Sequence, residues 1–165
     1  ASGSSWDAAP AAGAETAAGA ETAAAAPAAA ETVLPLAGLH LLLAEDNELN
    51  SEIATTLLEE QGASITAVEN GRLALEAIQN AAPRTYDAIL MDVMMPEMNG
   101  LEATRCIRAF EGKGPGEGTP IIAMTANVFA DDVKACLDAG MNSHVGKPLD
   151  MKVLIGEILK YTNAR

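Results

Sequence analysis

The strongest constraint on this sequence is a regular alternation of short apolar runs and longer segments with helical spacing, which begins at residue 39. The apolar runs occupy residues 39–44, 64–68, 88–92, 120–125 and 143–145. The segments between and after them carry apolar residues three or four positions apart, at residues 50–61, 71–80, 101–110, 130–139 and 149–161. This spacing is typical of amphipathic helices. Five strand–helix units in alternation predict an α/β domain, with a parallel sheet covered by helices on both faces.

Residues 1–38 have a different composition from the rest of the chain. They consist mainly of Ala, Gly, Pro, Glu and Thr, and the unit Ala-Ala-Gly-Ala-Glu-Thr occurs twice in succession at residues 11–22. Large apolar side chains are almost absent before Val33, so this segment has little to bury and is expected to be disordered or transiently helical. We interpret residues 1–38 as a linker or tail, in preference to a cloning remnant, and residues 39–165 as the folded domain.

Charge and cysteine content exclude several classes of function. The net charge of −13 and the lack of a Lys/Arg cluster argue against a nucleic-acid-binding surface. No apolar run approaches the roughly 20 residues of a membrane span, so no membrane contact is expected of this chain. Cys106 and Cys136 lack metal-binding spacing, and we expect reduced thiols in a cytoplasmic protein.

Polar and charged residues follow four of the five predicted strands. Glu45 and Asp46 follow the first strand, Asp92 ends the third, Thr125 ends the fourth, and Lys147 follows the fifth. In an open α/β sheet the carboxyl ends of the strands form the usual ligand-binding edge. Singly, each residue is most simply a turn, cap or packing residue. Jointly, their position at the ends of four strands indicates one site.

The residue types predict the chemistry of that site. Three carboxylates that lie together repel one another, and a hard divalent cation with oxygen ligands, such as Mg²⁺, relieves the repulsion. A hydroxyl from Thr125 and an ammonium from Lys147 add groups that suit a phosphoryl group, whose charge lies on its oxygens. Asp92 is then the expected nucleophile, and its product would be an aspartyl phosphate.

Four sequence motifs resemble the receiver domain of two-component response regulators. They are Leu-Leu-Ala-Glu-Asp-Asn (42–47), Met-Asp-Val-Met-Met-Pro-Glu-Met-Asn-Gly (91–100), Met-Thr-Ala-Asn (124–127) and Gly-Met-Asn-Ser-His-Val-Gly-Lys-Pro (140–148). The resemblance covers about residues 39–163. It implies a flavodoxin-like, three-layer (βα)5 fold with strand order 2-1-3-4-5, and phosphoryl transfer from a phosphohistidine to Asp92.

The resemblance also implies roles for individual residues. Asp46, Asp92 and the backbone carbonyl of Met94 would bind Mg²⁺ directly, and Glu45 would act mostly through water. Thr125 and Lys147 would hold the phosphoryl oxygens.

The resemblance further implies residues that take part in the conformational switch and residues that set the lifetime of the phosphoryl group. The peptide bond before Pro148 is expected to be cis. The family's switch couples Thr125 to an aromatic residue on the fifth strand, where this chain has His144. We expect His144 simply to replace that ring as a half-exposed residue, although its charge near pH 6.5 would allow a pH-sensitive switch. Met94 and Asn127 stand at positions thought to tune dephosphorylation.

The residues of two of these motifs indicate a subtype of receiver domain and its partners. Thr-Ala-Asn-Val-Phe-Ala (125–130) and Ala-Gly-Met-Asn-Ser-His-Val-Gly-Lys-Pro-Leu (139–149) resemble receivers at the C-terminus of hybrid sensor histidine kinases. The implied partners are a histidine kinase domain and a histidine phosphotransfer domain. The implied docking face includes Asn50, Ile53 and Ala54 of the first helix.

Other classes of protein remain to be weighed. A haloacid-dehalogenase-type hydrolase needs a second Asp two residues after the first, and position 94 is Met. A phosphorylation-independent interaction module would not need the full acidic set with Thr125 and Lys147. A stand-alone single-domain response regulator is the principal alternative, and it would differ only in what the gene encodes upstream of residue 1.

Overall fold

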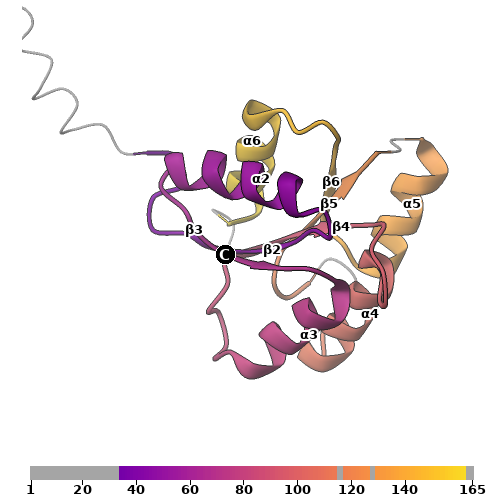
Figure 1. The fold of residues 1–165 in the computed structure, drawn as a ribbon. Helices are drawn as coiled ribbons and strands as arrows, with labels where there is room; N and C mark the ends of the chain where they lie inside the picture. Colours follow the sequence, from indigo (N-terminus) through magenta and orange to yellow (C-terminus); the bar gives the residue numbers. More distant parts are fainter. Residues whose placement is uncertain (1–33, 115–116, 127–128, 163–165) are drawn as a thin grey trace, which may run out of the picture. The chain divides into compact units, whose positions relative to one another are not determined.

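The computed structural model describes residues 34–114, 117–126 and 129–162. Strands and helices alternate along these residues, and they form a compact unit that begins at Pro35 (Figure 1). The strands are β2 (His40–Ala44), β3 (Ser64–Val68), β4 (Ala88–Asp92), β5 (Ile121–Thr125) and β6 (Ser143–Gly146). The helices are α2 (Glu48–Glu60), α3 (Gly71–Asn80), α4 (Gly100–Glu111), α5 (Ala130–Ala139) and α6 (Met151–Thr162).

The five strands form one parallel sheet in the order β3-β2-β4-β5-β6. Because β2 is the first strand of the alternation, this is the 2-1-3-4-5 order that the sequence predicts, and the predicted fold class is confirmed. In β2, Leu43 pairs with Ala67 of β3 on one side and with Leu90 of β4 on the other. The carboxyl ends of β2, β4 and β5 therefore lie side by side at one edge.

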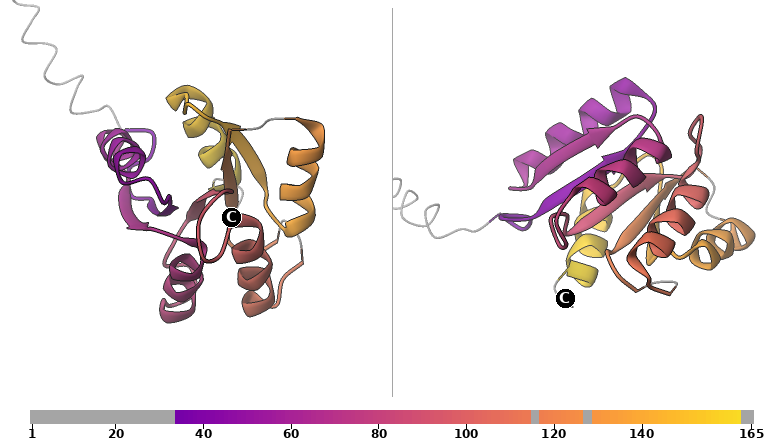
Figure 2. Two further views of the ribbon diagram at one scale, coloured as in Figure 1. Left: turned by 45° about the vertical axis from the view of Figure 1, so that its right-hand side comes forward. Right: turned by 90° about the horizontal axis from the view of Figure 1, so that it is seen from below.

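Helices cover both faces of the sheet. Helices α2 and α6 lie on one face, and α3, α4 and α5 lie on the other (Figures 1 and 2). Successive strand side chains point to opposite faces, so each strand contributes to both cores. Leu41 and Leu43 pack with α2 and α6, whereas Leu42 and Ala44 pack with α3, α4 and α5. All four side chains are completely buried.

Three asparagines fix where helices begin. The side chains of Asn47, Asn70 and Asn99 accept hydrogen bonds from the backbone N–H three residues on, at 2.9, 2.8 and 2.9 Å. Each such cap typically contributes about 1 kcal/mol to stability. Glycines end two of the helices: Gly112 follows α4 and Gly140 follows α5, both in the left-handed conformation. Asn47 and Asn99 also fix the two loops that follow β2 and β4.

The folded unit takes in part of the segment that we interpreted as a linker. The side chain of Leu36 is fully buried with Leu58, and its backbone N–H donates to the carbonyl of Gln61 at 2.9 Å. Residues 1–33 lie outside the described residues, so the disorder of the tail stays a prediction.

A buried arginine joins α4 to the strands beside it. Arg108 is 4 % exposed, and its guanidinium donates to the carbonyl oxygens of Gly140 at 2.9 Å and Thr119 at 2.8 Å. It also donates to Glu111 Oε1 and to Asn142 Oδ1, both at 2.9 Å. Burial lowers the pKa of this guanidinium, and the Glu111 carboxylate opposes that effect. Arg108 thus joins the end of α4 to the start of β5 and to the turn before β6.

Both cysteines are free thiols, with Cys136 buried and Cys106 partly buried. Burial raises the pKa of the Cys136 thiol, and nearby Asp132 adds to the shift. Within the described ranges, no helix has the length and apolar character needed to cross a membrane.

Candidate functional site

Three carboxylates come together at the carboxyl edge of the sheet, as the sequence predicts. Glu45 and Asp46 lie in the loop after β2, and Asp92 is the last residue of β4, the strand beside β2. One carboxylate oxygen from each residue lies within 4.8 Å of the others. Glu45 and Asp92 are buried, whereas Asp46 is exposed. The cluster therefore has two members in the protein interior and one that faces solvent.

The ammonium of Lys147 lies between the two buried carboxylates. Its Nζ is 2.8 Å from Glu45 Oε1 and 3.1 Å from Asp92 Oδ2. The backbone places it there, because the Lys147 N–H donates to the carbonyl of Thr125 at 2.9 Å, at the end of the neighbouring strand. The peptide bond between Lys147 and Pro148 is cis.

The pKa values of Asp92, Glu45 and Lys147 are shifted from their usual values. Burial, together with the nearby Glu45, raises the pKa of Asp92 to about 6, and Lys147 only partly opposes this shift. Burial also acts to raise the pKa of Glu45, but hydrogen bonds from Lys147 and from the Asn47 N–H outweigh it, so that pKa is lowered. The pKa of Lys147 is raised, because its two carboxylate partners outweigh its burial. Asp92 is therefore the member of the cluster that resists ionisation.

The charge of the cluster fits a divalent cation. With all three carboxylates ionised, one ammonium leaves the site with two negative charges in excess, and two of the carboxylates are buried. Carboxylate oxygens are the ligands that Mg²⁺ takes in proteins, usually with several waters retained. The exposed Asp46 leaves the solvent side of the cluster open for such waters. The residues present thus suit Mg²⁺.

The backbone after β4 folds back over the aspartate. The Met94 N–H donates to Asp92 Oδ1 at 3.3 Å, while Met94 as a residue is 75 % exposed. This places the Met94 backbone beside the carboxylate cluster. The predicted role of its carbonyl as a metal ligand stays a prediction.

Thr125 and His144 lie on the two strands that follow β4 in the sheet. Thr125 ends β5 and is buried, one position beyond Met124, the partner of Asp92 across β4 and β5. His144 lies in β6, pairs with Ala123 and is half-buried. Thr125 therefore reaches the edge where Asp92 lies, and His144 stands two positions before it in the register. Asn127 lies outside the described residues.

The backbone of Gly100 lies against the backbone of Asp92, and the sequence alone does not indicate this contact. In the structure Asn99 caps α4 and Gly100 is the first residue of that helix. A Cβ at Gly100 would lie 2.3 Å from the carbonyl oxygen of Asp92 and 2.9 Å from Met91 Cγ. Only glycine fits this contact, which joins α4 directly to the phosphoacceptor candidate.

An apolar surface adjoins the site on α2. A pocket beside Lys147 and Pro148 is lined on its other wall by Asn50 and Ile53. Ile53 is 48 % exposed and Leu49, which sequence reasoning did not single out, is 63 % exposed. Ala54 also lines this pocket, and the predicted part of Asn50, Ile53 and Ala54 in docking stays a prediction.

Ala54 is 4 % exposed and packs in the core beneath α2. It lies four residues before the buried Leu58, and residues at this spacing share one helix face. The exposed large apolar side chains of α2 are therefore Leu49 and Ile53.

The comparisons with known proteins agree with this geometry. The model of the response regulator receiver domain family matches residues 41–159. The chain is 41 % identical over 140 residues to probable histidine kinase 1 of Oryza sativa subsp. indica, an alignment of 68 % of this chain and 14 % of that protein. It is 38 % identical over 132 residues to the sensor histidine kinase GacS of Pseudomonas protegens, covering 80 % of this chain and 14 % of GacS. The chain therefore belongs to the response regulator receiver domain family.

Two solved structures are similar to the fold. One is the receiver domain of a sensor histidine kinase from Pseudomonas aeruginosa, which has a magnesium ion coordinated in its active-site cleft. Its TM-score to this fold is 0.67 and its sequence identity is 37 %, and the alignment covers 77 % of this chain and 99 % of that chain. The other is the receiver domain of Saccharomyces cerevisiae Ssk1 in a co-crystal with the histidine phosphotransfer protein Ypd1. Its TM-score is 0.69 and its sequence identity is 27 %, and the alignment covers 80 % of this chain and 92 % of that chain. This protein is thus a receiver domain similar to those of histidine kinases, with the acidic pocket typical of a phosphoacceptor aspartate, and it spans about one seventh of the kinases that it matches.

Proposed function

We propose that Asp92 accepts a phosphoryl group from a phosphohistidine and that the chain serves as the receiver in a phosphorelay. The observation that carries the proposal is the placement of the buried Asp92 carboxylate beside Glu45 and Asp46, with Lys147 Nζ 3.1 Å away. This arrangement combines a nucleophile, a cation site and a fixed ammonium at one sheet edge.

In the proposed step a carboxylate oxygen of Asp92 attacks phosphorus. The new O–P bond forms as the N–P bond to the donor imidazole breaks, and the imidazole keeps the bonding electron pair and takes up a proton. Asp92 must be ionised to attack, and its pKa of about 6 leaves it largely ionised at neutral pH. Hydrolysis by water would later release inorganic phosphate and restore the carboxylate.

Fixed charges in the site would stabilise the transferring group. Lys147 would move from Asp92 Oδ2 to a phosphoryl oxygen, and the Thr125 hydroxyl would donate to another. Bound Mg²⁺ would supply positive charge to the phosphoryl oxygens, with Glu45, Asp46, Asp92 and the Met94 carbonyl as the residues that hold it. This cofactor assignment is supported by the magnesium-bound Pseudomonas receiver and by the charge of the cluster.

The response to phosphorylation would pass through Thr125 and β6. Movement of the Thr125 hydroxyl toward the phosphoryl group would shift the end of β5, which pairs with Gly146. His144 on β6 would then rotate into the space that Thr125 leaves, in the role that an aromatic residue has in relatives. The half-burial of His144 is compatible with two positions.

We further propose that the chain is the receiver of a hybrid histidine kinase and receives its phosphoryl group within a cytoplasmic relay. The similar kinases are much longer, and the alignment covers 14 % of each of the two described above. The expected partners are a histidine kinase domain and a histidine phosphotransfer domain, of the kind that binds the Ssk1 receiver. The α2 surface with Leu49 and Ile53 would be their docking face. A full-length transcript that encodes a kinase domain upstream would support this architecture, and one that encodes only the receiver would replace it with a stand-alone regulator.

Incubation with acetyl phosphate, followed by intact-mass measurement, tests the chemistry. The wild-type chain should gain one phosphoryl group, about 80 Da, in Mg²⁺ and none in EDTA. Asp92→Asn should gain none, and Glu97→Gln, which removes an exposed carboxylate five residues away, should behave as wild type. No gain in any condition would favour a phosphorylation-independent module.

A further inference from the structure

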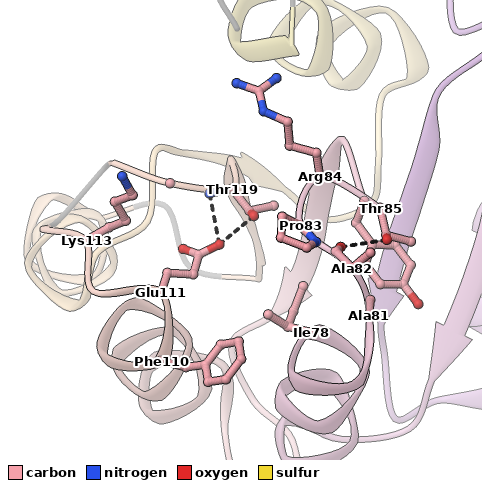
Figure 3. Close-up of a pocket in the computed structure, with 12 residues that line it drawn as sticks. Ile78, Ala81, Ala82, Pro83, Arg84, Thr85, Phe110, Glu111, Lys113 and Thr119 are labelled. Atoms are coloured by element: carbon pink, nitrogen blue, oxygen red, sulfur yellow. Dashed lines mark hydrogen bonds between the residues drawn. The ribbon is translucent and has the colours of Figure 1, made fainter.

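A second pocket lies at the opposite edge of the sheet from Asp92. It is formed by the end of α3, the loop before β4, the end of α4 and the segment before β5 (Figure 3). Because the strands are parallel, the amino ends of β4 and β5 lie at the edge away from Asp92 and Thr125. The volume of this pocket is about 570 Å³. Ligand pockets in proteins typically measure about 300–1,000 Å³, so this one is large enough for a small organic molecule.

The inner walls of this pocket are mainly apolar. Ile78 at the end of α3 and Phe110 at the end of α4 lie across from each other (Figure 3). Pro83 and Tyr86, in the loop between α3 and β4, also line the pocket. Phe110 is 52 % exposed and is one of only two phenylalanines in the chain. An exposed aromatic ring within a concave apolar surface is a typical feature of a binding pocket.

Two cationic side chains project from the rim. Arg84 lies in the loop before β4 and Lys113 follows α4, and both are exposed (Figure 3). Among the described residues, neither forms an ion pair. The chain has 23 acidic and 10 basic residues, so two cations at one pocket that have no carboxylate partner in the described part of the chain favour an anionic ligand. Arg84 also has a φ of +65°, which is uncommon outside glycine and sets the direction of this turn.

The one carboxylate in the wall does not oppose an anion strongly. Glu111 Oε1 accepts from Arg108 at 2.9 Å, and its Oε2 accepts from the Thr119 hydroxyl at 2.6 Å and the Thr119 N–H at 3.2 Å. Its side chain is 15 % exposed and its charge is matched by the buried guanidinium. The unmatched charge at the pocket is therefore positive.

We propose that this pocket binds a small aromatic anion, with the aromatic body between Ile78 and Phe110 and the acidic group at Arg84 and Lys113. The site is separate from the acidic cluster, so its occupation leaves Asp92 open. The probe for the test is 1-anilinonaphthalene-8-sulfonate, which combines an aromatic body with one sulfonate. Its neutral counterpart, N-phenyl-1-naphthylamine, has the same body without the charge.

The test measures the affinity of the folded wild-type chain for both probes by fluorescence, and locates the sulfonate by amide chemical shifts in NMR. The shifts should cluster at residues 78–86 and 110–113. Arg84→Gln and Lys113→Gln should each weaken sulfonate binding by roughly two- to five-fold and leave the neutral probe unchanged. Arg105→Gln, an equal charge change at an exposed site on α4 outside the pocket, should have no effect.

The apolar contact has its own control. Phe110→Ser should weaken the binding of both probes. Phe129→Ser, which removes the other exposed phenylalanine, should leave the binding of both unchanged. Equal responses of the two probes to the charge variants would overturn the anionic assignment. Shifts that map to the groove beside Pro148, or no saturable binding, would overturn the site. All five substituted side chains are exposed, so each variant is expected to fold, and thermal melts check this.

Discussion

Lys147 Nζ lies 3.1 Å from Asp92 Oδ2, and this contact connects the chemistry of the site to its stability. The ammonium neutralises one of two buried carboxylates and leaves the other only partly compensated. The site is consequently a region of unrelieved negative charge in the absence of a cation, which makes stability, metal binding and phosphorylation interdependent.

Asp92→Asn should stabilise the metal-free protein at neutral pH. The pKa of Asp92 rises from 3.8 to about 6 on folding, so the folded state binds its proton more tightly than the unfolded state does. Ionisation of Asp92 therefore destabilises the folded state. Its destabilising effect is absent below pH 4, grows as the pH rises and is complete above pH 6. We expect Asp92→Asn to add about 1–3 kcal/mol of unfolding free energy at pH 7.5 in EDTA and little at pH 4. Urea unfolding at the two pH values measures this. A variant less stable than wild type at pH 7.5 would contradict the assigned electrostatics.

Mg²⁺ should stabilise the wild-type chain and have less effect on that variant. A ligand that binds only the folded state stabilises it by about 1.4 kcal/mol for each tenfold excess over its Kd. The melting temperature should rise with Mg²⁺ concentration in wild type and in Glu97→Gln, and much less in Asp92→Asn. Equal shifts in all three would place the cation elsewhere.

Lys147→Met should destabilise the metal-free chain and tighten Mg²⁺ binding. Removal of the ammonium leaves Glu45 and Asp92 buried without their cationic partner, at an expected cost of about 1–3 kcal/mol. The same loss removes a positive charge that repels the metal. Lys152→Met, at an exposed position on α6, is the matched control. Urea unfolding and a Mg²⁺ titration measure the two effects, and weaker Mg²⁺ binding in Lys147→Met would contradict the account.

Substitution by alanine should change stability in opposite directions at Gly100 and at Gly156. At Gly100 a Cβ would meet the Asp92 carbonyl oxygen at 2.3 Å, so Gly100→Ala must move the site backbone. At Gly156 in α6 a Cβ has no neighbour within 4 Å, and Ala is favoured over Gly in a helix by about 0.5–1 kcal/mol. We expect Gly100→Ala to lose stability and phosphorylation rate, and Gly156→Ala to gain stability with an unchanged rate. A neutral Gly100→Ala would show that the close approach is not needed.

The docking face should matter for a protein donor and not for a small one. Ile53→Asp and Leu49→Asp place charge on the exposed α2 surface without disturbing the buried site. Each should slow phosphoryl transfer from a phosphorylated histidine phosphotransfer protein and leave the rate with acetyl phosphate unchanged. Val153→Asp, at a 50 % exposed position on α6, should change neither rate. Equal losses with both donors would mean that α2 supports the site itself.

The sequence predicted the elements well where their boundaries depend on local signals. The bounds of β3, α3 and α5 match the predicted ranges, and Gly140 ends α5 as expected of a glycine after a helix. The start of α6 at Met151, two residues later than predicted, follows from Asp150, whose Oδ1 accepts from the Lys152 N–H at 2.9 Å. The meeting of the carboxylates followed from strand order alone.

Features that depend on distant partners were not predictable in this way. Arg108 fits the spacing of a helix face, but its partners Gly140 and Asn142 lie 32 and 34 residues away. Ala54 and Ile53 are adjacent and both apolar, and only the packed sheet shows which one is buried. The contact of Gly100 with Asp92 likewise exists only once α4 packs against the end of β4.

The measurement that tests the central claim most directly is the location of the phosphoryl group. The chain is phosphorylated by acetyl phosphate in Mg²⁺ and treated at once with borohydride, which reduces an acyl phosphate to an alcohol. Peptide mass spectrometry then finds the altered residue. We predict conversion of Asp92 alone to homoserine, dependent on Mg²⁺ and absent from Asp92→Asn. Reduction at another carboxylate, or none in a chain that has gained the phosphoryl mass, would contradict the assignment of Asp92 as the phosphoacceptor.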